Sequence, residues 1–254
     1  MFNKMLIIVF LFGLAVGSFL NCLIYRLETK QDFLFGRSFC PKCHHILKWY
    51  DLIPLLSFVL LKGRCRYCKK KISFQYPLVE LFTGILFSLF FIFHFSFFIY
   101  LISCFLIVIF VYDLKHYIVP DKIIYPAIAL ALFYQLFEIW NLEGWSPSEI
   151  RSLGYGLLPS LFLLGIILAS YGKWMGFGDF KLAILMGLIL NWPKVLVALF
   201  FSFFLGGIIS IGLLLTKKKK LTSEVPFAPF LVSGTFIALF WGERIINWYM
   251  SFLK

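Results

Sequence analysis

Charged residues are scarce in this 254-residue chain: Asp, Glu, Lys and Arg make up 14% of it, against about 25% in an ordinary soluble domain. Acids are the scarcest, with 12 Asp and Glu against 24 Lys and Arg. So little charge excludes a soluble globular protein. The 61% hydrophobic content, with 33 Phe, excludes a disordered chain, because that much apolar surface does not stay unfolded in water. A membrane protein with several spans remains.

Long apolar runs fill most of the sequence, and about 17–25 such residues cross the hydrocarbon as a helix. We therefore expect an all-α polytopic membrane protein with about eight transmembrane helices. The expected spans are Leu6–Tyr25, Leu78–Phe93, Ser96–Tyr112, Ile123–Trp140, Ser152–Tyr171, Leu182–Trp192, Val195–Leu215 and Pro226–Trp241. The sixth is short, which leaves a re-entrant segment open as an alternative there.

The distribution of positive charge predicts the orientation, because Lys and Arg are retained on the cytoplasmic side of a membrane. With the N-terminus outside, 19 of the 24 Lys and Arg residues face the cytoplasm, including 11 in residues 26–71 and four in Lys217–Lys220. The sequence thus predicts a multi-pass, N-out protein of the bacterial cytoplasmic (inner) membrane. A cleaved signal peptide is the alternative for the first segment, and it would carry the most basic loop outward. The basic excess points to topology and the lipid bilayer, not to nucleic acid.

A polar stretch, residues 26–76, separates the first two spans and contains two C-x2-C pairs with 21 residues between them. Two such turns can converge tetrahedrally on Zn²⁺, and about 50 residues make too small a core to fold without a staple. We expect a small cytoplasmic zinc-ribbon-like insert, with reduced thiols, or His44 and His45 as substitute ligands, as alternatives. The expected zinc ligands are Cys40, Cys43, Cys65 and Cys68.

Two acids stand at the ends of apolar runs, where an ionisable group is costly and marks function by default. Asp113 ends the third expected span and Asp179 opens the sixth, so the topology places both at the cytoplasmic face. Two carboxylates at one depth can share a proton, so that one acts as a base on water while the other remains an acid. This is the chemistry of an aspartic protease. The alternative is a pair of interfacial charges at helix ends.

Taken in order, the motifs of the chain resemble those of the prepilin peptidases, also called type IV leader peptidases, over essentially its whole length. The motifs are Gly17-Ser18-Phe19-Leu20-Asn21 with Tyr25-Arg26-Leu27, the two cysteine pairs, Trp49-Tyr50-Asp51-Leu52-Ile53-Pro54, Tyr76-Pro77-Leu78-Val79-Glu80, Asp113 with Pro120-Asp121, Gly176-Phe177-Gly178-Asp179-Phe180-Lys181 and Pro226-Phe227-Ala228-Pro229-Phe230. The chain departs from the family pattern in the insert, where Glu28 replaces a Pro and His44 and Lys69 each replace a Gly.

This resemblance implies an enzyme that removes the short basic leader from prepilins or pseudopilins at the cytoplasmic membrane face. The resemblance also implies that the same enzyme then methylates the new N-terminal residue with S-adenosylmethionine. The resemblance implies that Asp113 and Asp179 are the catalytic pair. Residues 1–25 would be the first transmembrane helix, 26–76 the zinc-binding insert and 77–254 the peptidase core. The motif residues that support the pair are Pro120, Asp121, Gly176, Gly178 and Lys181.

The cofactor site has no recognisable nucleotide-binding loop, so methyl transfer rests on the resemblance. Candidate cofactor-binding residues are Asn21, Arg26, Asp51 and Glu80. The alternatives are a peptidase without methyltransferase activity, a transporter that uses the membrane aspartates as an ion relay, and a zinc-ribbon assembly factor.

Overall fold

The structure is a computed structural model that describes residues 2–29, 31, 36–141, 147–216 and 225–252. Within these ranges the chain is helical, and its only β-pairing consists of two isolated bridges. It divides into two units, Met1–Val108 and Ile109–Lys254, each described by itself. The basic run Lys217–Lys220, which the sequence assigns to the membrane surface, lies outside the described residues.

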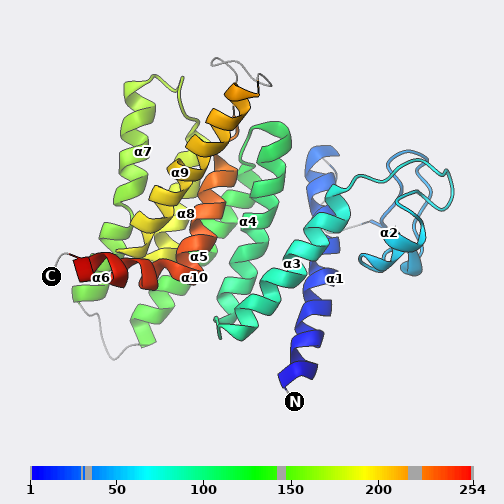
Figure 1. The fold of residues 1–254 in the computed structure, drawn as a ribbon, viewed down its shortest axis with the longest axis horizontal. Helices are drawn as coiled ribbons and strands as arrows, with labels where there is room; N and C mark the ends of the chain where they lie inside the picture. Colours follow the sequence, from blue (N-terminus) through cyan, green and yellow to red (C-terminus); the bar gives the residue numbers. More distant parts are fainter. Residues whose placement is uncertain (1, 30, 32–35, 142–146, 217–224, 253–254) are drawn as a thin grey trace. The chain divides into compact units, whose positions relative to one another are not determined.

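The first unit is built on two long helices joined through the insert (Figure 1). Its elements are α1 (Phe2–Thr29), the short helices η1 (Trp49–Asp51) and α2 (Leu56–Leu60) of the insert, α3 (Gln75–Ile92) and the beginning of α4 (Phe97–His116). The rings of Phe87 and Phe90 pack edge-on against Tyr100 and join α3 to α4.

Small residues let α1 and α3 approach closely. Gly13 and Gly17 are four residues apart and therefore share one face of α1. A Cβ at Gly13 would lie 2.8 Å from the Cα of Gly84, and one at Gly17 would lie 2.7 Å from the Cα of Glu80. Larger side chains would force the two backbones apart, as is general for glycine-lined helix contacts in membranes.

The helices of the second unit pack around one central helix (Figure 1). After the end of α4 its elements are α5 (Asp121–Asn141), α6 (Pro147–Gly156), α7 (Leu158–Ala169), α8 (Phe177–Leu190), α9 (Lys194–Leu215) and α10 (Ala228–Phe252). Helix α8 contacts α5, α6, α7, α9 and α10, and its last six residues are all buried. It is the central helix of this unit.

The fifth expected span, Ser152–Tyr171, is interrupted between α6 and α7 at Leu157. Pro159 stands in the first turn of α7. Proline has no N–H to donate and its ring clashes with the carbonyl one turn earlier, so a continuous helix is broken there.

The all-α membrane architecture is confirmed. Seven helices among the described residues are long and apolar enough to cross a membrane, whereas the sequence predicts about eight. The difference is α8, the helix of the expected span Leu182–Trp192, which has 14 residues. Such a helix is about 21 Å long, against about 30 Å of hydrocarbon. Other helices of the unit cover the apolar residues of α8. Hydropathy does not distinguish side chains buried by other helices from side chains that face lipid.

Candidate active site

Asp113 lies in the last turn of α4 and is 4% exposed. The backbone N–H of Ala228, at the start of α10, donates a hydrogen bond to its carboxylate. Its Oδ2 atom is buried and has no hydrogen-bond partner among the described residues. A buried carboxylate oxygen that the protein leaves unbonded marks a place for a water molecule or a substrate group.

Asp179 is the third residue of α8 and is half-buried. Its carboxylate accepts a hydrogen bond from the backbone N–H of Gly176, the residue that caps the helix. A carboxylate at this position commonly reaches back to the cap in this way. The carboxylates of Asp113 and Asp179 lie close enough for the charge of one to act on the other. The fold thus brings together the two acids singled out from the sequence.

Steric contact explains why the third position of the G-x-G-D motif, Gly178, is a glycine. A Cβ at Gly178 would lie 2.9 Å from both the Cβ and the Cγ2 of Val119, in the loop between α4 and α5. A Cβ at Gly176 would meet only the backbone nitrogen of Gly178, at 3.9 Å. Gly178 therefore lets the first turn of α8 approach the segment that follows Asp113, and Gly176 does not serve that contact.

An ion pair joins α8 to α5 beside this contact. Lys181 Nζ lies 2.6 Å from Asp121 Oδ1 and 4.7 Å from the centre of the Tyr125 ring. Pro120 is buried, and its carbonyl accepts the first backbone hydrogen bonds of α5. The motif residues Pro120, Asp121, Gly178 and Lys181 thus surround the first turns of the two helices.

Sequence reasoning missed three residues at this site: Val119, Tyr125 and Ala228. Ala228 contributes a backbone N–H, and a backbone donor leaves no chemical signature in the sequence. The only signal for it was its place in the Pro226–Phe230 motif, to which no role was attached.

The four cysteines of the insert converge. Their sulfur atoms all lie within 4.8 Å of one another, and the sulfurs of Cys40 and Cys68 are 3.9 Å apart. Four thiolates at the usual Zn–S length of about 2.3 Å would have sulfurs about 3.8 Å apart in a tetrahedron. All six cysteines of the chain are free thiols. The cluster could therefore hold a metal ion with four sulfur ligands.

The two C-x2-C turns have the same backbone geometry. The N–H of His44 donates to the carbonyl of Cys40 (2.9 Å), and the N–H of Lys69 donates to the carbonyl of Cys65 (3.0 Å). His44 and Lys69 both have positive φ, 56° and 57°. This left-handed conformation costs a residue with a Cβ about 1–2 kcal/mol, and glycine adopts it freely.

The two histidines beside the first pair contact aromatic rings instead of joining the sulfur cluster. His44 stacks on Phe39 with ring centres 5.7 Å apart, and His45 lies over Tyr67 at 3.6 Å. Burial alone would raise the pKa of the Cys65 thiol, but backbone N–H groups of Cys68 and Tyr67 lower it to about 7. A thiol with such a pKa is readily present as the thiolate that metals bind.

Three of the four candidate cofactor residues connect α1, α3 and the insert. Each is buried and uses its polar group in a hydrogen bond within this unit. The bonds run from Asn21 Nδ2 to the Tyr76 carbonyl (3.0 Å), from Arg26 Nη2 to the Gly36 carbonyl (2.6 Å) and from the Leu55 N–H to Glu80 Oε2 (2.8 Å).

Asp51, the fourth candidate, connects η1 to the second cysteine turn. Its side chain is 3% exposed and accepts hydrogen bonds from Arg66 Nε (2.7 Å), the Tyr67 hydroxyl (3.2 Å) and the Lys48 backbone N–H (3.3 Å). Burial opposes ionisation of this carboxyl, but the bonds from Arg66 and Lys48 outweigh it and hold its pKa below the usual range. Asp51 therefore acts within the insert as a structural anion.

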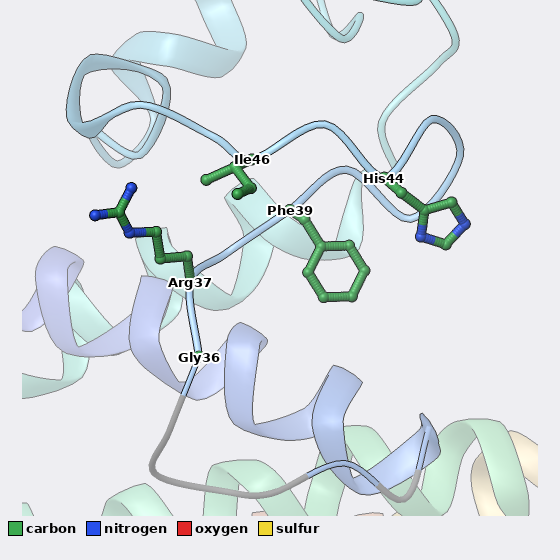
Figure 2. A pocket seen from close by; sticks show the side chains of 5 residues that line it. All are labelled: Gly36, Arg37, Phe39, His44 and Ile46. Carbon is green, nitrogen blue, oxygen red and sulfur yellow. The ribbon is translucent and has the colours of Figure 1, made fainter.

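A hollow of about 440 Å³ lies on the insert and is drawn in Figure 2. Its lining residues are Gly36, Arg37, Phe39, His44 and Ile46. The rings of Phe39 and His44 lie on one side of the loop, while the Arg37 guanidinium points to the other (Figure 2). The hollow is largely open to solvent and offers aromatic and apolar walls.

The fold and the site describe an all-helical membrane protein with paired aspartates and a four-cysteine insert. Comparison with known proteins identifies its family. Two family models match in succession: "Bacterial Peptidase A24 N-terminal domain" on residues 11–95 and "Type IV leader peptidase family" on residues 100–211. The chain belongs to the type IV leader peptidase family. The resemblance seen in its motifs is confirmed.

Curated relatives of the chain carry the name "Prepilin leader peptidase/N-methyltransferase". The protein from Aeromonas salmonicida is 33% identical over 96% of this chain and 93% of its own length. The protein from Legionella pneumophila is 33% identical over 98% and 95%, and that from Bacillus subtilis 32% identical over 97% and 98%. No solved structure matches the chain.

The two glycines of the G-x-G-D motif should respond differently to the same change. Gly178→Ala should lower peptidase activity strongly, because its Cβ would displace Val119 and move Asp179 away from Asp113. Gly176→Ala is the matched control and should retain most of the activity. Peptide cleavage by the two purified variants, with circular dichroism to verify folding, measures this. Equal losses would contradict the steric account.

Proposed function

We propose that this protein is a membrane aspartic endopeptidase that removes the leader from prepilins or pseudopilins and then N-methylates the new N-terminal residue. The observation that carries the proposal is the pair Asp113 and Asp179, held together at the ends of two helices of one unit. The shared name of the curated relatives supports both activities. The seven long apolar helices support a substrate presented at a membrane.

The two carboxylates would work as a pair that shares one proton, because like charges a few ångströms apart do not both ionise. The ionised carboxylate takes a proton from water, and the water oxygen bonds to the peptide carbonyl carbon. The protonated carboxyl polarises the carbonyl oxygen. The carbon–nitrogen bond then breaks, and the departing amine receives a proton from the pair. Because the pair titrates as a unit, neither Asp113 nor Asp179 has a fixed role.

The surroundings of the pair would hold it in position for this chemistry. The N–H groups of Ala228 and Gly176 orient one carboxylate each. Gly178 lets α8 lie against Val119 in the loop that follows Asp113, and Lys181 pairs with Asp121 at the beginning of α5. The unbonded Oδ2 of Asp113 is the atom we assign to the attacking water.

We further propose that the chain lies in the bacterial inner membrane with its N-terminus outside and the active site at the cytoplasmic face. The asymmetry of positive charge supports this orientation, because 19 of the 24 Lys and Arg residues then face the cytoplasm. A substrate with a basic leader would present its scissile bond where its helix leaves the bilayer, at the depth of Asp113 and Asp179.

The four-cysteine cluster would hold a structural Zn²⁺. Four convergent thiols, two of them buried, are a ligand set that zinc prefers, and all four positions are taken by protein atoms. The ion would connect two turns that are otherwise joined by a small core. It would thereby fix the insert rather than take part in hydrolysis.

The methyl donor, S-adenosylmethionine, would bind at the hollow on the insert. When bound, it supplies an electrophilic methyl group for the new terminal amine. Phe39 and His44 would provide an aromatic wall for the adenine ring, and Arg26 supports the hollow through its hydrogen bond to Gly36. Asn21, Glu80 and Asp51 would support the surrounding backbone rather than contact the donor.

Replacing either catalytic acid should separate the two activities. We expect Asp113→Asn and Asp179→Asn each to lower leader removal by about 100-fold or more, because an amide neither accepts the proton of water nor shares one. Methylation of a peptide supplied without its leader should persist. Mass spectrometry of substrate peptides measures both products. Persistent cleavage in either variant would refute the catalytic pair, and absent methylation by the wild type would indicate a peptidase only.

Replacing one zinc ligand should remove the metal. Cys65→Ser should lose most of the zinc that the purified wild-type protein carries, while Cys104→Ser, which changes a cysteine within α4, should retain it. Inductively coupled plasma mass spectrometry gives the zinc content per chain. Equal zinc in both variants would exclude the four-cysteine cluster as the site.

Two glycine substitutions test the donor site, and both relieve the same kind of backbone strain. His44→Gly and Lys69→Gly each relieve a positive φ in an equivalent turn, but only His44→Gly removes a ring from the hollow. We expect His44→Gly to weaken S-adenosylmethionine binding roughly 2- to 10-fold, the value of one aromatic contact, and Lys69→Gly to leave it unchanged. Isothermal titration calorimetry measures the affinities. Identical affinities would place the donor elsewhere.

A further inference from the structure

One face of α2 is apolar and exposed although the insert lies outside the spanning helices. Leu56, Val59 and Leu60 are spaced so that they share one side of the helix, and we refer to these three residues as the α2 face. They are 51%, 69% and 71% exposed. Contiguous exposed apolar side chains of this size mark a surface that something else covers.

The opposite side of α2 is already in contact with the protein. The ring of Phe58 packs edge-on against Phe74 with centres 5.6 Å apart, and it lies over Gly63. Phe74 is the cap residue directly before α3. The α2 face is therefore directed away from the insert and held beside the beginning of a spanning helix.

A hydrogen bond sets the level of α2 along that helix. The N–H of Leu55, the residue before α2, donates to Glu80 Oε2 at 2.8 Å, in the second turn of α3. On either side of Glu80, Leu78 and Leu81 are 62% and 39% exposed. At this level α3 already presents apolar side chains outward, so α2 lies at the boundary between water and the apolar part of the membrane.

The segment that follows α2 has the charge of a lipid-binding surface. Residues 62–71 include six Lys and Arg and no acid. Lys62, Arg64 and the three consecutive lysines Lys69–Lys71 are exposed. Apolar side chains next to clustered positive charge are the combination that binds the interface of a membrane with anionic lipids.

We propose that the α2 face enters the lipid interface of the membrane that α1 and α3 span, while the basic residues 62–71 contact anionic headgroups. The insert is then held against the membrane surface by this contact in addition to its two connections to the spanning helices. A substrate helix or a second copy of the chain would also cover an apolar face. The positive charge and the level fixed by Glu80 favour lipid.

Photocrosslinking of the full-length protein tests this contact. We would replace Val59 or Leu60 with p-benzoylphenylalanine and reconstitute the protein into vesicles of phosphatidylcholine with phosphatidylglycerol as the minor, anionic component. The same replacement of Phe58 is the matched control, because it lies on the same helix and faces inward. Leader cleavage by each variant verifies that it is folded. After illumination, mass spectrometry identifies the adducts.

Val59 and Leu60 should give lipid adducts in several-fold higher yield than Phe58, which should react within the chain. Their yield should fall when phosphatidylglycerol is left out. Equal lipid labelling at Leu60 and Phe58, or adducts at Leu60 with a second chain or a substrate peptide in place of lipid, would overturn the proposal. A yield that does not depend on phosphatidylglycerol would overturn the part assigned to residues 62–71. Because cleavage and methylation are measured separately, these outcomes are distinguishable from failure of the proposed function.

Discussion

A carboxylate or amide removed from water must be given partners by the protein itself, and the polar sites of this chain depend on that constraint. Desolvation without compensation costs several kcal/mol for a polar group and more for a charge. Asp113 has the N–H of Ala228, and Asn21 has the carbonyl of Tyr76. The N–H of Ala228 stands at the beginning of α10, where N–H groups lack partners within their own helix, and the Tyr76 carbonyl has two lone pairs with which to accept.

The same constraint makes the unsatisfied oxygen of Asp113 informative. Its Oδ2 is buried and unbonded among the described residues, as are the amide oxygens of Gln75 and Asn191. A purely structural carboxylate would be expected to have both oxygens satisfied. The proposed hydrolysis needs one carboxylate oxygen available for the attacking water, and this atom would meet that need.

The insert solves a different problem, that of a segment too small to fold by burial alone. Its two cysteine turns have equivalent backbone geometry, and both accept a strained φ at the residue after the second cysteine. Asp51 links η1 to the second turn, and Glu80 connects the insert to α3. With these connections in place, the apolar side chains of α2 are left on the outside, beside the beginning of a spanning helix. Structural zinc and lipid contact would thus be complementary ways of fixing the same segment.

The sequence alone determined the helical membrane class, the family and the four cysteines that converge. Apolar runs predict helices directly, because lipid allows few alternatives to a helix. The spacing of the cysteines predicts a metal cluster because each pair is local in the sequence. The sequence alone did not show that α8, at 14 residues, is covered by the other helices of its unit. The motif positions of Asp113 and Asp179 were visible, but the contact between Gly178 and Val119 that brings their helices together was not.

Only the tertiary structure decided how the polar groups are used. It assigned Asn21, Arg26, Asp51 and Glu80 to hydrogen bonds that fix the backbone, and it brought the N–H of Ala228 to Asp113. The physical reason is that such partners come from segments distant in sequence and are often backbone atoms, which every residue possesses. Residue type shows which groups are costly to bury. The folded chain alone determines which atoms compensate that cost.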